Sequence, residues 1–183
     1  GTRGSADTRD KEAADAAKVM GIVHRENLKF KDGFFINDEF HQLKVVKIIR
    51  KYRPAVVLCN AITDRHPDHG KGSKLISDAC FLAGLVKVKT TLDGKEQEAH
   101  RPQAVYHYIQ DRYMKPDFVV DISEEFTQRM EAIKAYHSQF YDENSSEPAT
   151  AISSKEFMQM LESRPAEFGR LIGVKYAEGF VTE

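Results

Sequence analysis

Two histidines three residues apart, each close to an aspartate, are the side chains of this sequence best suited to chemistry. They lie in the stretch Asp64-Arg65-His66-Pro67-Asp68-His69-Gly70. One imidazole can bind a metal ion, while another that a carboxylate orients can serve as a general acid or base. If the stretch opens a helix, the two rings face the same space, and the helix N-terminus favours an anionic ligand or a neutral imidazole. On pattern alone, histidines at this spacing also occur by chance on protein surfaces.

The elements around this stretch predict an α/β fold. Val56–Cys59 is short, wholly apolar and rich in β-branched residues, which is typical of a strand covered on both faces of a parallel sheet. Pro67 suits the first turn of a helix that continues to about Leu85. Further strands are predicted at 104–109 and 118–122, and further helices begin near Asp7, Asn37, Ser123 and Ser153. This alternation indicates a Rossmann-like, mostly parallel sheet with helices on both faces, whose ligands bind where the strands end.

Composition narrows the classes of protein. A chain of 183 residues with 41% apolar and 10% aromatic residues fits a single domain, 1–183, with its own core. The net charge of −1 argues against a nucleic-acid binder, and no apolar run approaches the roughly 18 residues of a membrane span. Cys59 and Cys80 lie in apolar surroundings without a disulfide pattern, so we expect a reducing, cytoplasmic location. The sequence does not decide whether the protein forms a homo-oligomer.

The stretch from Asp64 to His69 resembles the second motif of the LmbE-like (PIG-L) zinc de-N-acetylases. Five more segments resemble the branch of that family that deacetylates N-acetylglucosaminyl-malate in bacillithiol biosynthesis: GTRG (1–4), HRP (100–102), FVVDIS (118–123), AIKAYHSQF (132–140) and IGVKYAEGF (172–180). The resemblance implies a cytoplasmic hydrolase that uses Zn²⁺ to remove the acetyl group from a small-molecule N-acetylglucosamine conjugate.

The resemblance also implies a role for each member of the site. His69 would bind zinc. His66 would stabilise the oxyanion or protonate the leaving amine, with Asp68 holding its ring. Arg3 would face the anionic end of the substrate. Two further arginines are candidates for the same contact, with surface salt bridges as the alternative: Arg65 and Arg101.

One motif of that family has no counterpart here. Members carry A-H-P-D-D or A-H-P-D-E after their first strand, whereas the only H-P-D of this sequence begins at His66. We therefore expect a chain truncated at its N-terminus, without its first βα unit, and inactive by itself, because a hydrolytic zinc needs about three protein ligands and a water. The other histidines are expected to be surface or structural residues: His24, His41, His107 and His137.

Two alternatives remain open at this point. The enzyme could deacetylate another N-acetylated sugar, such as a chitooligosaccharide. The chain could instead be an inactive sugar-binding or interaction module that keeps the same fold without the metal.

Overall fold

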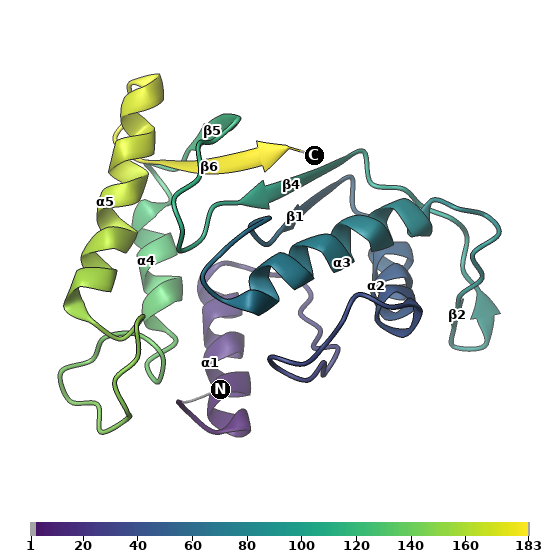
Figure 1. Cartoon of the computed structure of the whole chain (residues 1–183), viewed down its shortest axis with the longest axis horizontal. Helices are drawn as coiled ribbons and strands as arrows, with labels where there is room; N and C mark the ends of the chain where they lie inside the picture. Colours follow the sequence, from purple (N-terminus) through teal and green to yellow (C-terminus); the bar gives the residue numbers. More distant parts are fainter. Residues whose placement is uncertain (1–2, 183) are drawn as a thin grey trace. The chain divides into compact units, whose positions relative to one another are not determined.

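The computed structural model describes residues 3–182, which form two compact units (Figure 1). Of the described residues, 3–27 and 119–178 form the helical unit, and 28–118 and 179–182 form the sheet unit. The helical unit contains α1 (Ala6–Val19), α4 (Phe126–Lys134) and α5 (Lys155–Ile172). The sheet unit contains α2 (Glu39–Tyr52), β1 (Val56–Cys59), α3 (Pro67–Ala83), β2 (Thr91–Leu92), β3 (Lys95–Glu96) and β4 (Ala104–Tyr108). Two strands each contribute residues to both units, namely β5 (Phe118–Asp121) and β6 (Ala177–Thr182).

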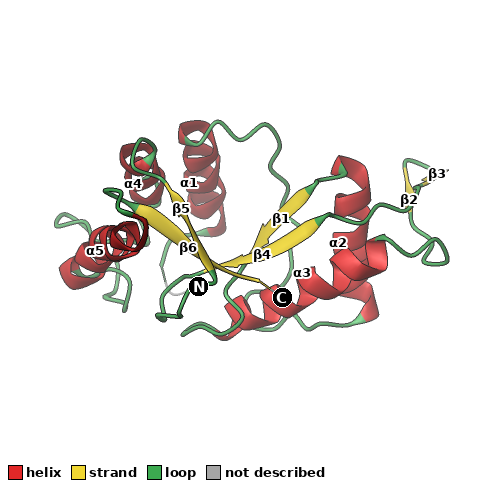
Figure 2. Ribbon diagram, turned by 90° about the horizontal axis from the view of Figure 1, so that it is seen from above, coloured by secondary structure: helices red, strands yellow, loops and turns green. Residues whose placement is uncertain are grey.

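The predicted α/β class is confirmed, but the sheet is mixed rather than mostly parallel. Its strand order is β1-β4-β6-β5, which can be followed in Figure 2. Strands β1 and β4 run parallel, with Val57 opposite Val105, whereas β6 runs antiparallel to β4. The sequence did not predict β6, because its Glu178 and Gly179 weaken the apolar, β-branched pattern that marks a strand.

Strand β1 is buried on one face only, which differs from the prediction of a strand covered on both. Cys59 is 1% exposed, while Val56 and Leu58 are 49% and 55% exposed. Val57 and Val105 pack against the core formed by α2 and α3. Both described helices of the sheet unit therefore cover the same face of the β1–β4 pair, and helices on both faces are not found within this unit.

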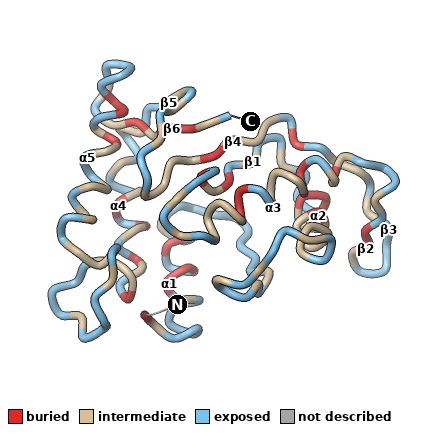
Figure 3. The backbone as a smooth tube through the Cα atoms, viewed as in Figure 1, coloured by how far each residue is buried: buried red, intermediate tan, exposed pale blue. Residues whose placement is uncertain are grey.

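The core of the sheet unit lies between α2 and α3 (Figure 3). The spacing of three between Phe40, Leu43, Val46, Ile49 and Tyr52 predicts a buried stripe along α2. Val46 and Ile49 are buried, whereas the ends of the stripe, Phe40 and Tyr52, are exposed. Helix α2 begins after Asp38, whose carboxylate accepts a hydrogen bond from the backbone N–H of His41, as a helix cap should. The buried members of the core are Val46, Ile49, Ala79, Cys80 and Ala83.

In the helical unit, two helices begin or end at residues other than those predicted. The apolar residues Phe126, Met130, Ile133 and Phe140 predict a helix that Ser123 caps and that continues to Phe140. Instead, α4 begins at Phe126 and ends at Lys134, and the hydroxyl of Ser123 donates a hydrogen bond to Asp121 in its own loop. Ser154, rather than Ser153, caps α5 by accepting a hydrogen bond from the backbone N–H of Phe157. Among the residues described, no helix combines the length and the apolar character that crossing a membrane requires.

Arg50 fastens α2 to the C-terminal end of α3 through a buried guanidinium. Its nitrogens donate to the carbonyl oxygens of Ala83 (3.0 Å), Leu85 (3.0 Å) and Val88 (2.8 Å), and to the hydroxyl of Thr90 (2.8 Å). Burial lowers the pKa of Arg50, yet a guanidinium stays charged at neutral pH. The cation therefore neutralises the carbonyl-rich end of α3, where a helix carries partial negative charge.

Replacing Arg50 by lysine is expected to lower the free energy of unfolding by about 2–3 kcal/mol, because one ammonium leaves buried carbonyl oxygens unpaired. Urea denaturation followed by circular dichroism measures the change. The control is Arg53→Lys at the exposed end of α2, where a single 3.5 Å hydrogen bond to Ala99 is at stake. Equal effects of the two substitutions would contradict the role given to Arg50.

Candidate functional site

The two histidines of the motif open helix α3, as predicted. His66 is the N-cap residue, and its Nδ1 accepts a hydrogen bond of 3.2 Å from the backbone N–H of Asp68. Pro67 occupies the first turn, where its missing N–H costs nothing. The rings of His66 and His69 lie with their centroids 5.3 Å apart, so both imidazoles border the same small volume.

A buried carboxylate holds the ring of His69. The side chain of Asp64 is 0% exposed; its Oδ2 contacts Nδ1 of His69, and its Oδ1 accepts a hydrogen bond of 2.7 Å from the backbone N–H of Arg112. Burial raises the pKa of Asp64, but the hydrogen bonds from Arg112 and His69 outweigh it, and the pKa is lowered overall. Sequence reasoning missed this role of Asp64, because contacts across a helix start follow no helical period.

This contact determines which nitrogen of His69 faces outward with a lone pair. When Nδ1 carries the proton that Asp64 accepts, Nε2 carries the lone pair. A carboxylate, an imidazole and a metal ion in series form the arrangement found at many zinc sites. His69 is 31% exposed, so its ring is within reach of a ligand. Its surroundings therefore suit the role of metal ligand that the sequence resemblance implied.

The loop that leads to the histidines is fixed by neighbours on β4 and α3. His107, in β4, is 1% exposed, and its Nδ1 lies 2.9 Å from both the carbonyl oxygen of Asn60 and the hydroxyl of Ser73. Gln110 follows β4, and its Oε1 accepts hydrogen bonds from the side chain of Asn60 and the backbone N–H of Ala61, both 3.1 Å. His107 is thus a structural residue, as expected.

Helix α3 packs closely against this loop at two glycines. A Cβ atom at Gly70 would lie 3.0 Å from the carbonyl oxygen of Ile62, and one at Gly72 would lie 3.1 Å from the side-chain oxygen of Asn60. Both distances are tighter than ordinary contacts. The first turns of α3 therefore pack closely against the residues that follow β1.

The carboxylate of Asp68 faces the neighbouring loop rather than the ring of His66. It accepts hydrogen bonds from the backbone N–H of Gly33 (2.5 Å) and from Nζ of Lys71 (3.3 Å). Lys71 also donates to the carbonyl oxygen of Gly33 (3.0 Å). The contact of Asp68 with the ring of His66 comes from its backbone N–H, which differs from the implied role of its carboxylate.

Asp32, His66 and Asp68 together form a group that could hold a metal ion. One ligand atom of each lies within 4.8 Å of the others. One imidazole and two carboxylates are a donor set that zinc accepts. Tetrahedral zinc with bonds of about 2.0–2.1 Å brings ligand atoms to within roughly 3.4 Å of one another, so these side chains would have to move inward. The sequence around Asp32 predicts only a turn and gives no indication of a metal ligand.

The structure brings Arg65 near the histidines but not Arg101. Arg65 pairs with Asp111, on the loop after β4. The guanidinium of Arg101 lies 4.5 Å from the centre of the Phe81 ring, near the C-terminal end of α3. With a rise of about 1.5 Å per residue, Phe81 lies about 18 Å along the helix axis from His69.

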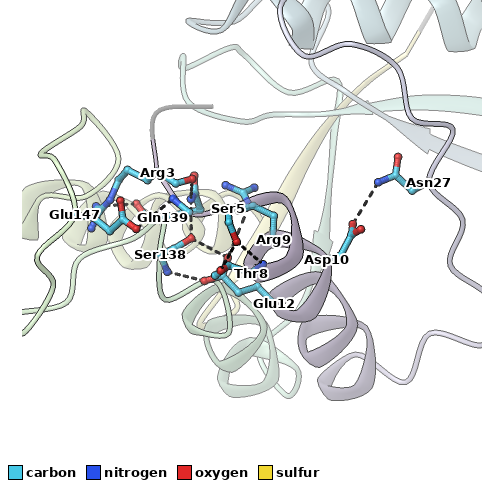
Figure 4. Close-up of polar contacts among 11 residues, drawn as sticks. Arg3, Ser5, Thr8, Arg9, Asp10, Glu12, Asn27, Ser138, Gln139 and Glu147 are labelled. Carbon is cyan, nitrogen blue, oxygen red and sulfur yellow. Dashed lines mark hydrogen bonds and ion pairs between the residues drawn. The ribbon is translucent and has the colours of Figure 1, made fainter.

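Arg3 belongs to the helical unit, where it lies beside Gln139 (Figure 4). The residue is 4% exposed. Its guanidinium donates to the carbonyl oxygen of Gln139 (3.4 Å) and to the hydroxyl of Ser145 (2.7 Å), and Gln139 donates back to the carbonyl oxygen of Arg3 (3.0 Å). These contacts tie the start of the chain to the segment after α4. Recognition of a substrate carboxylate by Arg3 stays a prediction.

Comparisons with known proteins agree on a family. The model of the family described as PIG-L: GlcNAc-PI de-N-acetylase matches residues 2–80, which include both histidines of the motif. The crystal structure of the conserved protein TT1542 from Thermus thermophilus superposes with a TM-score of 0.84 at 34% identity, over 100% of this chain and 76% of that one. The chain belongs to the PIG-L family.

Two relatives with named activities add detail to the PIG-L assignment. The diacetylchitobiose deacetylase of Thermococcus kodakarensis is 27% identical over 171 residues, 92% of this chain and 60% of that protein. The N,N′-diacetylchitobiose deacetylase of Pyrococcus horikoshii shares the fold, with a TM-score of 0.78 at 23% identity over 97% of this chain and 64% of that one. The chain thus spans less than two thirds of the length of either deacetylase.

The comparisons shift the expected substrate within the PIG-L family. Both named relatives are deacetylases of diacetylchitobiose, a chitooligosaccharide. They support the alternative of another N-acetylated sugar better than the N-acetylglucosaminyl-malate branch that short segments of the sequence resemble. The bacillithiol assignment is therefore not supported, whereas the family itself is.

Replacing Asp64 by asparagine is expected to lower the free energy of unfolding at pH 7 by about 1–3 kcal/mol, because a buried charge-assisted hydrogen bond is lost. The folded-state pKa of Asp64 is lowered, so its stabilising contribution is complete above the unfolded value of about 3.9 and is lost as the pH falls through the folded value. Urea denaturation between pH 7 and pH 3 should therefore show the difference between variant and wild type shrinking on acidification.

The matched control is Asp111→Asn, which removes the partly exposed ion pair with Arg65. Its effect should stay below about 1 kcal/mol. A difference for Asp64→Asn that is constant from pH 7 to pH 3 would show that Asp64 is not the ionised partner of His69.

Proposed function

We propose that this chain forms part of a metal-dependent de-N-acetylase that hydrolyses the acetamide of a small N-acetylated sugar of the diacetylchitobiose class. The observation that carries the proposal is the pair of imidazoles at the start of α3, with His69 held by the buried carboxylate of Asp64. A PIG-L match over the residues that build this pair supports amide hydrolysis rather than a binding module.

Each histidine has a distinct role in this proposal. Asp64 orients His69 so that its Nε2 is available as a zinc ligand. Zinc, when bound, polarises the acetamide carbonyl and lowers the pKa of a bound water towards about 7. His66 is placed beside that position. Because its Nδ1 accepts a hydrogen bond from the backbone N–H of Asp68, its proton is on Nε2, from which it can donate a hydrogen bond to the oxyanion. Water is consumed, the C–N bond breaks, and acetate and a free amine are released.

A neutral sugar fits the charges around the motif. Asp32 and Asp68 lie next to His66, and Lys71 contacts Asp68. Positive and negative side chains are thus mixed around the motif. A substrate with carboxylates would bind better to a cationic patch. Together with the names of the two relatives, this supports a chitooligosaccharide over N-acetylglucosaminyl-malate.

The proposal is tested by incubating the protein at its natural length, loaded with zinc, with N,N′-diacetylchitobiose and measuring the acetate and free amine formed. N-Acetylglucosaminyl-malate, assayed in parallel, decides between the two substrate classes. Faster turnover of the malate conjugate would overturn the substrate proposed here, and hydrolysis of neither would overturn the enzymatic function.

His69→Ala is expected to abolish both zinc binding and activity, because it removes a ligand of the metal. His66→Ala is expected to keep the zinc and to lower kcat by about 10²–10³-fold, the usual cost of losing one group that stabilises an oxyanion. Metal content by mass spectrometry and initial rates on the same samples separate the two effects.

The control is His100→Gln, at the far end of α3, where the ring bonds the carbonyl oxygen of Pro54 (2.8 Å) and the backbone N–H bonds that of Ala83 (2.9 Å). It should retain both zinc and activity. If His69→Ala keeps its zinc while Asp32→Asn loses it, the metal belongs to the group of Asp32, His66 and Asp68 instead.

A further inference from the structure

Phenylalanines are concentrated in the segment that borders the candidate site. Residues 30–40 contain four of the 11 phenylalanines of the chain. Gly33, within this segment, is bonded through its N–H to Asp68 (2.5 Å) and through its carbonyl oxygen to Lys71 (3.0 Å). Asp68 lies in the same helical turn as His66 and His69. The residue that follows Gly33, Phe34, is therefore held at the border of the site.

Phe34 differs from Phe30 and Phe35 because it is largely exposed. Phe30 and Phe35 are half-buried and contact each other, with ring centroids 6.0 Å apart, whereas Phe34 is 73% exposed. The ammonium of Lys31 lies over the Phe34 ring, 4.8 Å from its centre. A cation covers only one face of an aromatic ring, so the other face is available. Most of the segment that precedes α2 in the sequence is exposed or half-buried (Figure 3).

We infer that Phe34 is a stacking platform for the sugar ring next to the one whose acetamide is hydrolysed; the inference rests on the proposed function. A pyranose presents C–H groups on its faces and hydroxyl groups around its rim. It can therefore cover an exposed phenyl ring while its hydroxyl groups stay hydrated. Burying apolar surface on both partners is the favourable term, and it needs no charge on the sugar.

The occupant is a second N-acetylglucosamine residue rather than an anionic group. Asp32 lies two residues before Phe34, and the carboxylate of Asp68 is bonded to Gly33, immediately before it. The ammonium groups of Lys31, over the Phe34 ring, and Lys71, on Asp68, accompany these two carboxylates, so the charges around Phe34 offer no net attraction for an anionic group. Phe34 thus contributes to specificity for a disaccharide over a monosaccharide.

Phe34→Ala tests the inference through the chain length of the substrate. It should raise KM for N,N′-diacetylchitobiose by about 3- to 10-fold, the range of one aromatic contact, and leave kcat unchanged. KM for monomeric N-acetylglucosamine should not change, and Phe34→Tyr should restore wild-type KM for the disaccharide. The control is Phe40→Ala on α2, another exposed phenylalanine with a lysine over its ring, Lys44 at 4.5 Å, and it should change neither KM.

Equal effects of Phe34→Ala on both sugars, or no effect on either, would overturn the inference while leaving the deacetylase function in place. A calorimetric titration with diacetylchitobiose, made in the inactive His69→Ala background, provides a second readout that needs no hydrolysis. If the wild type hydrolyses neither sugar, the proposed function fails. The titration then still tests whether Phe34 binds the disaccharide. Weaker binding on adding Phe34→Ala supports the platform, and unchanged or undetectable binding refutes it.

Discussion

The close approach of α3 to the chain leaving β1 is the constraint on which the candidate site depends. At Gly70 and Gly72 the helix approaches Ile62 and Asn60 so closely that a Cβ atom would lie only 3.0 and 3.1 Å from their oxygen atoms. Because protein interiors are densely packed, contacts this tight permit few alternative positions. The backbone that carries His66 and His69 is thereby fixed before any contact of the imidazoles themselves is considered.

Hydrogen bonds from β4 and from the residues that follow it extend this constraint to Asp64 and His69. His107 and Gln110 hold the first residues after β1, and the backbone of Arg112 holds the carboxylate of Asp64. That carboxylate in turn sets the orientation of His69. The parallel pairing of β1 with β4 is what brings these groups together, because the carboxyl ends of parallel neighbours lie at the same edge of a sheet. The orientation of the His69 ring therefore depends on the parallel pairing of β1 with β4.

The sequence predicted the parts of this arrangement that follow local rules. Pro67 at a helix start, the apolar Val56–Cys59 and the buried positions Val46 and Ile49 all have signals within a few residues, and all are found. The pairing of Asp64 with His69 and the position of Asp32 beside His66 depend on turns whose direction no periodic pattern encodes.

The largest errors concern elements whose burial depends on distant partners. Strand β1 is apolar on both faces, yet Val56 and Leu58 are exposed, because both helices of its unit lie on the other side. Strand β6 has a weak local pattern and is recognised only through its pairing with β4. Arg101 and the two histidines both lie in segments that resemble one family. Arg101 lies near the C-terminal end of α3, however, and the histidines lie at its N-terminal end. A shared motif set does not establish a shared site.

The bonds of Arg50 also bear on which parts of the sheet unit open together. Because one buried guanidinium joins α2 to the carbonyl groups at the end of α3, neither helix can unravel there without exposing the cation's partners. The two helices should therefore exchange their amide hydrogens with deuterium slowly and as one cooperative unit. Residues 28–38, which contain no helix or strand, should exchange far faster. The candidate site would then lie between a helix that exchanges slowly as part of a cooperative unit and a segment without helix or strand that exchanges faster.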